Sequence, residues 1–169
     1  MDQNIEFKLR PWKLTDAGSL VKYANNLNIA KYLTDLFPHP YSSDDAIKFI
    51  TMVSSGNPVS VFAIEIYGEA SGGIGLHPQK DIFRNNAELG YWLAEPYWGQ
   101  GIITRAIREM VKFGFENLDI NRIYARPFGS NVGSQKVLEK AGFALEGRFL
   151  KTLIKMGEYE DELVYAVRK

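Results

Sequence analysis

The sequence has no cysteine, and histidine occurs only twice in its 169 residues. A chain without cysteine has no disulfide, no thiolate nucleophile and no zinc site built on thiolates. His39 and His77 are too far apart in the sequence for the spacing of a local metal-binding motif. We therefore expect a protein that binds no metal.

Net charge and long apolar runs are also missing. Lys and Arg together number 20, as do Asp and Glu, so the formal net charge is zero. Such a balance predicts no bulk attraction to nucleic acid or to an anionic membrane. No stretch reaches the roughly 18 apolar residues of a membrane span, and the first residues, MDQNIEFKLRPW, do not resemble a signal peptide. We expect a cytoplasmic protein with no nucleic-acid or membrane partner.

Hydrophobic residues make up 46% of the chain, enough for the core of a single domain over residues 1–169. Segments with the two-residue apolar spacing of strands and segments with the spacing of helices follow one another along the chain. Strands are predicted at residues 5–10, 59–66, 73–76, 87–93, 122–126, 144–149 and 160–167, and helices at 15–24, 28–33, 42–53, 102–118 and 132–141. Because helices lie between strands, the pattern predicts an α+β fold with a mixed sheet.

The sharpest local motif is Gly99-Gln100-Gly101, which stands between a predicted strand and a long amphipathic helix. Glycines allow a tight turn close to a ligand, and the start of a helix presents unpaired N–H groups. The motif predicts a site for a diphosphate, although a plain strand-to-helix turn would have the same pattern. The dinucleotide pattern G-x-G-x-x-G fails because Thr104 stands where its third glycine belongs.

Two longer stretches, AELGYWLAEPYWGQGIITRAI and NRIYARPFGSNVGSQKVLEKAGFALEG, resemble the GNAT superfamily of N-acetyltransferases. The similarity is closest to the branch that acetylates alanine or serine at the N-termini of ribosomal proteins, and it extends from LRPW to DELVYAV. It implies a single domain with a mixed, mostly antiparallel twisted sheet, a splayed central strand pair and flanking helices. It also implies that acetyl-CoA is the co-substrate.

The resemblance assigns most candidate site residues to the coenzyme. It implies that the backbone amides of the glycine turn bind the CoA pyrophosphate, that the amide of Leu93 faces the thioester carbonyl, and that side chains nearby meet phosphates. The amides are those of Gln100, Gly101, Ile102, Ile103 and Thr104, and the side chains are Arg105, Asn131, Lys136 and Lys140. Solvated surface charge is the plainer interpretation of each cation, and a helix cap is that of Asn131.

For catalysis the resemblance implies direct attack of an amine on the thioester. Glu88 is the candidate base and Ser134 the candidate acid, with Tyr124 and Tyr159 as further candidates. Many relatives have a tyrosine seven residues after the asparagine, but Leu138 stands there in this chain. The chain also departs from the family at Ile103, where the family pattern has glycine or alanine. It departs again at Leu153, where some members of the branch have a glutamate.

The acceptor is an amine on a small molecule or a peptide, and a protein N-terminus is one candidate. Aromatic and acidic residues are candidates for its pocket, namely Phe37, Tyr41, Phe83, Tyr91, Tyr159, Asp35, Asp44 and Asp81. A homodimer is possible. Two other functions fit the same sequence: an acyl-CoA-binding module without catalysis, favoured by the departures from the family, and a nucleotide-dependent enzyme with an unrelated glycine turn.

Overall fold

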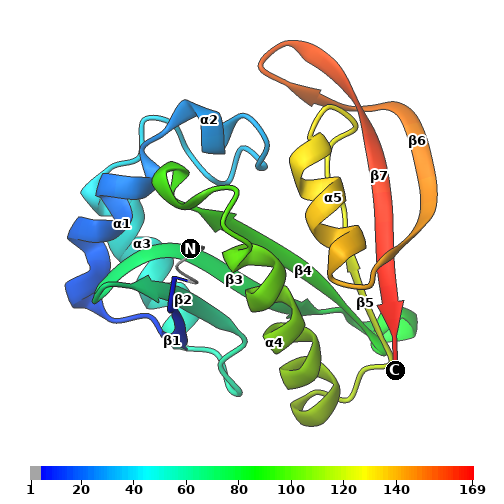
Figure 1. Cartoon of the computed structure of the whole chain (residues 1–169), viewed down its shortest axis with the longest axis horizontal. Coiled ribbons are helices and arrows are strands. Elements are labelled where there is room, and N and C mark those ends of the chain that lie inside the picture. Colours follow the sequence, from blue (N-terminus) through cyan, green and yellow to red (C-terminus); the bar gives the residue numbers. More distant parts are fainter. Residues whose placement is uncertain (1–4) are drawn as a thin grey trace. The chain divides into compact units, whose positions relative to one another are not determined.

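A computed structural model describes residues 5–169 of the chain (Figure 1). Its strands are β1 Lys8–Pro11, β2 Val61–Ile66, β3 Glu69–Pro78, β4 Asn86–Leu93, β5 Arg122–Ala125, β6 Ala144–Lys155 and β7 Glu158–Arg168. Its α-helices are α1 Ala17–Ala24, α2 Leu27–Ala30, α3 Ser43–Ser54, α4 Ile102–Asn117 and α5 Val132–Lys140. Short 3-10 helices are η1 Leu14–Asp16, η2 Asp81–Phe83 and η3 Glu95–Tyr97.

The strands form a seven-stranded mixed sheet in the order β1-β2-β3-β4-β5-β7-β6. The pairs β1–β2, β2–β3, β5–β7 and β6–β7 are antiparallel, whereas β4 and β5 are parallel. Parallel neighbours need a long crossover connection, and α4 lies in the one between β4 and β5. The predicted α+β class and mostly antiparallel sheet are therefore confirmed.

The β4–β5 ladder is short. It runs from Asn86 opposite Arg122 to Glu88 opposite Tyr124, although β4 continues to Leu93. Across the described residues, the two strands thus share only the first part of β4. This early end of the ladder agrees with the splayed central pair predicted from the sequence.

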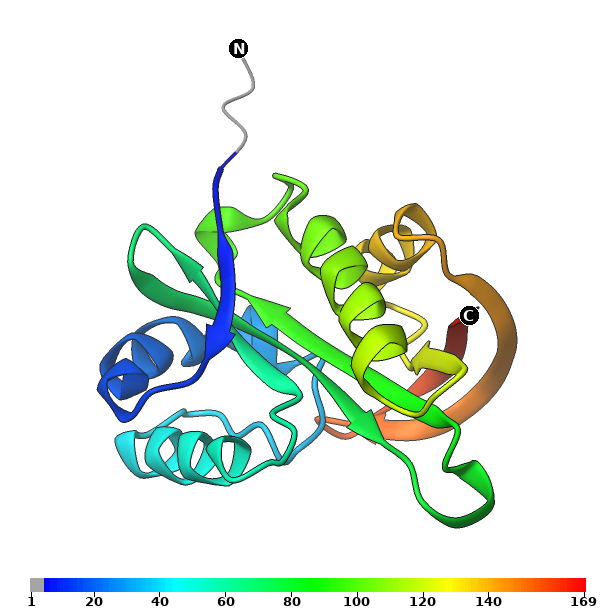
Figure 2. The ribbon, with the colours of Figure 1, turned by 90° about the horizontal axis from the view of Figure 1, so that it is seen from below.

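Two compact units make up the chain. Unit 1 contains the chain as far as Gly75 together with Tyr91–Ala106, and unit 2 contains Leu76–Gly90 together with Ile107–Lys169. In unit 1, α1 and α3 lie side by side (Figure 2), and their apolar faces share one core with β2 and β3. That core includes Trp12, Leu20 and Ile50, which are all buried.

Unit 2 packs α4 closely on the sheet. A Cβ at Gly114 of α4 would lie 2.6 Å from Cδ1 of Leu76 and 3.1 Å from Cδ1 of Ile123, so a larger residue there would displace these side chains. The long hairpin of β6 and β7 curves beside α5 (Figure 1), and the Tyr165 hydroxyl donates to Glu139 of that helix at 3.0 Å.

Helix boundaries follow from local capping chemistry. Ser42 caps α3, accepting a hydrogen bond from the Asp45 amide, and Gly142 follows α5 with a φ of +97°. Other boundaries differ from the prediction. The first strand begins at Lys8 rather than Ile5, α2 ends at Ala30, and β6 extends to Lys155. Strand ends depend on which backbone groups find a partner, and apolar spacing does not report that.

Candidate active site

The glycine turn before α4 has a left-handed backbone at both of its glycines. Gly99 and Gly101 have φ angles of +75° and +72°, a region in which glycine alone is unstrained. The Arg105 amide donates to the Gly101 carbonyl at 3.2 Å, which makes Gly101 the N-cap of α4. The amides from Gly101 to Thr104 therefore precede the first intrahelical hydrogen bond, and they lie at the positive end of the helix dipole.

No side chain at the N-cap competes for these amides, because Gly101 has none. By contrast, the side chains of Ser42 and Asn131 accept from the first-turn amides of α3 and α5. The start of α4 thus has the free backbone donors on which the predicted diphosphate site depends.

Side-chain hydrogen bonds to the backbone stiffen the turn. Trp98 donates from Nε1 to the Leu93 carbonyl at 2.7 Å, and Gln100 donates from Nε2 to the Pro96 carbonyl at 3.0 Å. Both bonds join the turn to residues just before it, so the position of the turn is coupled to the end of β4.

A second contact ties the turn to the first helices. Glu95, the first residue of η3, accepts from Asn26 Nδ2 at 2.6 Å and from Asn28 Nδ2 at 3.2 Å and 3.3 Å. These bonds, first that of Asn26, hold the pKa of the Glu95 carboxyl below its ordinary value. Asn26 is also the N-cap of α2, where its side chain accepts from the Asn28 amide. The sequence prediction missed this contact, which joins residues 69 positions apart.

Leu93 lies at the end of β4, and its side chain is buried. The next amide, that of Ala94, donates to the Ser71 carbonyl on β3 at 2.8 Å. Since successive backbone groups of a strand point to opposite edges, the Leu93 amide points away from β3. This orientation is compatible with the predicted role of that amide at the thioester carbonyl.

Arg105 has contacts of its own that the sequence did not predict. Its Nη2 donates to the Ile5 carbonyl at 2.7 Å, and its guanidinium lies 5.0 Å from the centre of the Phe7 ring. These contacts hold the side chain against the segment that precedes β1.

The candidate base Glu88 belongs to unit 2, where a guanidinium holds it. Arg126 donates from Nε and Nη2 to the two carboxylate oxygens of Glu88 at 2.8 Å and 3.0 Å. Burial first, and then the charge of Glu88, raises the pKa of the Tyr124 hydroxyl on β5. Glu88 is therefore a half-buried, ion-paired carboxylate beside a tyrosine.

The second motif begins α5. Asn131 caps the helix, because its Oδ1 accepts from the Ser134 amide at 3.2 Å. Ser134 is half-buried, and Lys136 and Lys140 are exposed. The cap interpretation of Asn131 is confirmed, whereas the contacts of these residues with a coenzyme stay a prediction. Leu138 is completely buried, so the position of the usual tyrosine belongs to the core.

Among the acceptor candidates, those in unit 1 are close to one another. The Phe37 ring lies 5.1 Å from Tyr41 and 5.8 Å from Trp92, centre to centre, and burial raises the pKa of Tyr41 to about 12. In unit 2, by contrast, Phe83 and Tyr159 are more than 60% exposed.

The acidic acceptor candidates and the two histidines lie on the surface. Asp35, Asp44, Asp81, His39 and His77 are exposed. An open hollow of about 670 Å³ on unit 1 is lined by none of the candidates; its residues are Lys22, Tyr23, Asn25, Asn26, Leu27, Glu95 and Pro96. From residue 5 onward, no three His, Asp or Glu side chains gather as a metal site would require.

No helix within the described part of the chain is long and apolar enough to cross a membrane.

Comparison with known proteins places this geometry in a family. Residues 6–144 match the model of the acetyltransferase (GNAT) domain. The chain is 32% identical to the uncharacterized N-acetyltransferase p20 of Bacillus licheniformis over 142 residues, which are 82% of this chain and 79% of that protein. It is 36% identical over 102 residues to YdaF of Bacillus subtilis (strain 168), whose name describes a ribosomal N-acetyltransferase. That segment is 60% of this chain and 55% of YdaF, so the chain spans about half the length of that relative.

A solved structure supports the fold over nearly the whole chain. RimL, a ribosomal L7/L12 α-N-protein acetyltransferase solved with coenzyme A, has a TM-score of 0.85 against this structure at 22% identity. The similarity covers 96% of this chain and 93% of RimL. The match over residues 6–144, together with the glycine turn and the seven-stranded sheet, shows that the chain belongs to the GNAT family of N-acetyltransferases.

Proposed function

We propose that the chain transfers the acetyl group of acetyl-CoA to a primary amine by direct attack of the amine on the thioester. The observation that carries the proposal is the glycine turn at Gly99 and Gly101, which leaves the first amides of α4 without a capping side chain. In this proposal the amides from Gln100 to Thr104 bind the diphosphate of the coenzyme. The family match over residues 6–144 supports one acetyltransferase domain.

The amine has to be neutral when it attacks. An α-amino group has a reference pKa of about 8 and a lysine of about 10.4, so the neutral form costs about 1.4 and about 4.6 kcal/mol at pH 7. A weakly basic carboxylate is therefore more adequate for an N-terminus than for a lysine. We therefore favour a protein or peptide α-amine as acceptor, because it needs less help from the carboxylate of Glu88 than a lysine would. The names of YdaF and RimL point in the same direction.

In the proposed reaction the amine nitrogen forms a bond to the thioester carbon, and the carbon–sulfur bond then breaks. Glu88 takes the proton from the nitrogen, directly or through water, while the Leu93 amide donates to the developing oxyanion. The leaving thiolate resembles an ordinary thiol with a pKa near 8.5, so it needs little help. Ser134 is the candidate donor to it, and Asn131 and Lys136 are proposed to lie beside the coenzyme.

A thiol-release assay with acetyl-CoA and a panel of amines tests the proposal. The panel contains N-terminal peptides, polyamines, amino acids and aminoglycosides. We expect thiol release with at least one amine class, peptides first, and loss of turnover in Glu88→Gln with acetyl-CoA binding retained. Glu109→Gln on the exposed part of α4 is the matched control and should keep its turnover.

The panel also separates the alternatives. Binding of acetyl-CoA without thiol release for any amine would favour a catalytically silent acyl-CoA-binding module. Unchanged turnover in Glu88→Gln would remove Glu88 as the base and leave the transferase proposal standing. The cytoplasm, where acetyl-CoA is available, and a homodimer stay predictions.

A further inference from the structure

Arg126 stands where a parallel strand pair ends. It directly follows β5, and Tyr124, two residues earlier, is the register partner of Glu88 on β4. Side chains two residues apart on a strand share a face, so Arg126 lies on the face of Tyr124. The position on β4 two residues beyond Glu88 is Gly90, which has no side chain. The Arg126 guanidinium therefore has room to reach diagonally back to Glu88.

The contact that results is bidentate. Nε and Nη2 of Arg126 donate to separate oxygens of Glu88 at 2.8 Å and 3.0 Å. Two parallel N–H···O bonds fix the plane of a carboxylate as well as its position, which one ammonium does not do. The orientation of the Glu88 carboxylate therefore depends on the orientation of the Arg126 guanidinium.

Arg126 is itself held from its other side. Its Nη1 donates to Glu162 of β7 at 3.3 Å, and the Thr152 hydroxyl of β6 donates to the other oxygen of Glu162 at 3.4 Å. The side chain of Glu162 is 18% exposed, the least of the three charged groups. Since β5 lies between β4 and β7, the guanidinium bridges carboxylates from the two strands that flank its own.

We infer that Arg126 is a positioning residue for the reaction, which aims the Glu88 carboxylate, with Glu162 holding Arg126 in place. The inference rests on the proposed function, because it gives that function's base its geometry. Nothing in the sequence pattern marks Arg126, since the pair joins residues 38 positions apart.

The charged and titratable groups around Glu88 come from three strands. Arg126 and Tyr124 belong to the β5 segment, with the Arg122 guanidinium 4.8 Å from the Tyr124 ring centre. Glu162 faces the site from β7, and His77 of β3 lies beside Gly90. Of these groups only Arg126 donates two hydrogen bonds to Glu88, so its removal should change the orientation of the carboxylate more than any other single substitution nearby.

The test compares Arg126→Gln, Arg126→Lys and Glu162→Gln in the full chain. The measurement is kcat and KM for thiol release, with acetyl-CoA binding by calorimetry and thermal melting as folding controls. In Arg126→Gln we expect kcat to fall by about ten- to a hundredfold at pH 7, because the carboxylate loses its fixed orientation, while KM for acetyl-CoA stays the same.

Arg126→Lys keeps the charge but loses the second hydrogen bond, so we expect a partly restored kcat. Glu162→Gln should lower the rate less than Arg126→Gln does. Coenzyme affinity should be unchanged in all three variants.

Two results would overturn the inference while leaving the proposed function intact. The first is an active parent with an unaltered kcat in Arg126→Gln, and the second is a loss of kcat that Arg126→Lys does not reduce. A parent that releases no thiol with any amine overturns both, and so identifies the proposed function as the point of failure.

Discussion

Gly101 bears the strongest constraint of any single residue in the proposed coenzyme site. Its φ of +72° lies in the left-handed region, and a Cβ built on it meets no atom within 4 Å. The cost of any other residue there is therefore conformational rather than steric, on the order of 1–2 kcal/mol. The turn can avoid that cost only by moving its amides.

Gly101→Ala should accordingly lower the free energy of unfolding by about 1 kcal/mol and weaken acetyl-CoA binding severalfold, because relaxation of the turn misaligns the donors. Urea denaturation and calorimetric titration measure the two effects. The matched control is Gly18→Ala in α1, where a Cβ also meets nothing within 4 Å and φ is not positive. That change should stabilise the helix by about 0.5–1 kcal/mol and leave binding alone. Equal behaviour of the two variants would remove the left-handed turn from the account.

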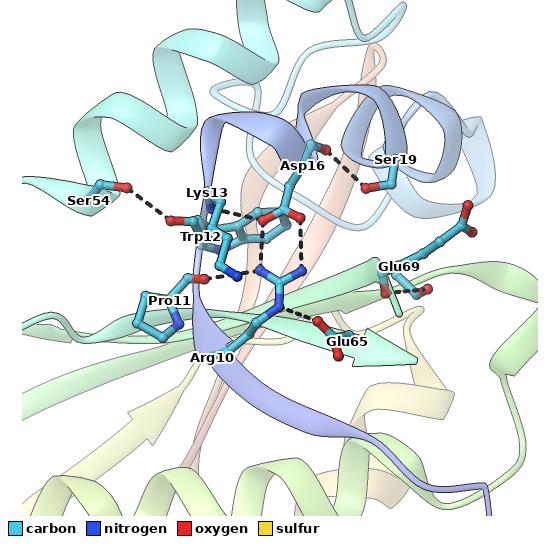
Figure 3. Close-up of polar contacts among 10 residues, drawn as sticks. Arg10, Pro11, Trp12, Lys13, Asp16, Ser19, Ser54, Glu65 and Glu69 are labelled. Atoms are coloured by element: carbon cyan, nitrogen blue, oxygen red, sulfur yellow. Dashed lines mark hydrogen bonds and ion pairs between the residues drawn. The ribbon is translucent and has the colours of Figure 1, made fainter. Parts of the chain in front are cut away.

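At the scale of elements, β1, η1 and β2 are joined by one arginine (Figure 3). Arg10 of β1 donates from Nη1 and Nη2 to the two oxygens of Asp16 in η1, both at 2.8 Å, and from Nε to Glu65 of β2. Burial alone would raise the pKa of Asp16, but the bonds from Arg10 and from the Lys13 amide outweigh it, and the pKa lies below its ordinary value. The bonds from Arg10 likewise lower the pKa of Glu65.

A carboxyl whose pKa is depressed by folding stabilises the protein above its unfolded pKa, about 3.9 for Asp, and loses that contribution as pH falls through the folded value. We expect the free energy of unfolding to fall below about pH 4 and the fall to be shallower in Asp16→Asn. At neutral pH Asp16→Asn should cost about 1–3 kcal/mol, because the substitution leaves a partly buried guanidinium short of one of its two carboxylate partners.

Lys22→Gln is the control for that experiment, since the pair of Lys22 and Glu69 is exposed. It should change neither the stability at neutral pH nor the acid limb. An acid limb of the same slope in Asp16→Asn and in the parent would show that the Arg10 cluster does not set the pH dependence.

The elements also show what a sequence can predict. The glycine turn and α4 were predictable, because conformational freedom at Gly101 and helical spacing from Ile102 are properties of a few neighbouring residues. The pair of Glu88 and Arg126 was not, because it depends on the register of two parallel strands and on the empty position at Gly90. The same holds for Glu95 and Asn26, which meet only after α2 and η3 have folded.

On the scale of the whole molecule, each compact unit contains some of the residues to which the proposal assigns a role. Unit 1 contains the glycine turn and Leu93, and unit 2 contains Glu88, Asn131 and Ser134. The strands β3 and β4 each run through both units.

The most direct test of the central claim is a calorimetric titration of the full chain with acetyl-CoA. Separate titrations with ATP and NAD, whose phosphates can also bind to a glycine turn, serve as the comparison. The account predicts one acetyl-CoA site per chain and no heat of binding from ATP or NAD. Absence of binding by acetyl-CoA, or saturable binding of ATP or NAD in its place, would contradict it.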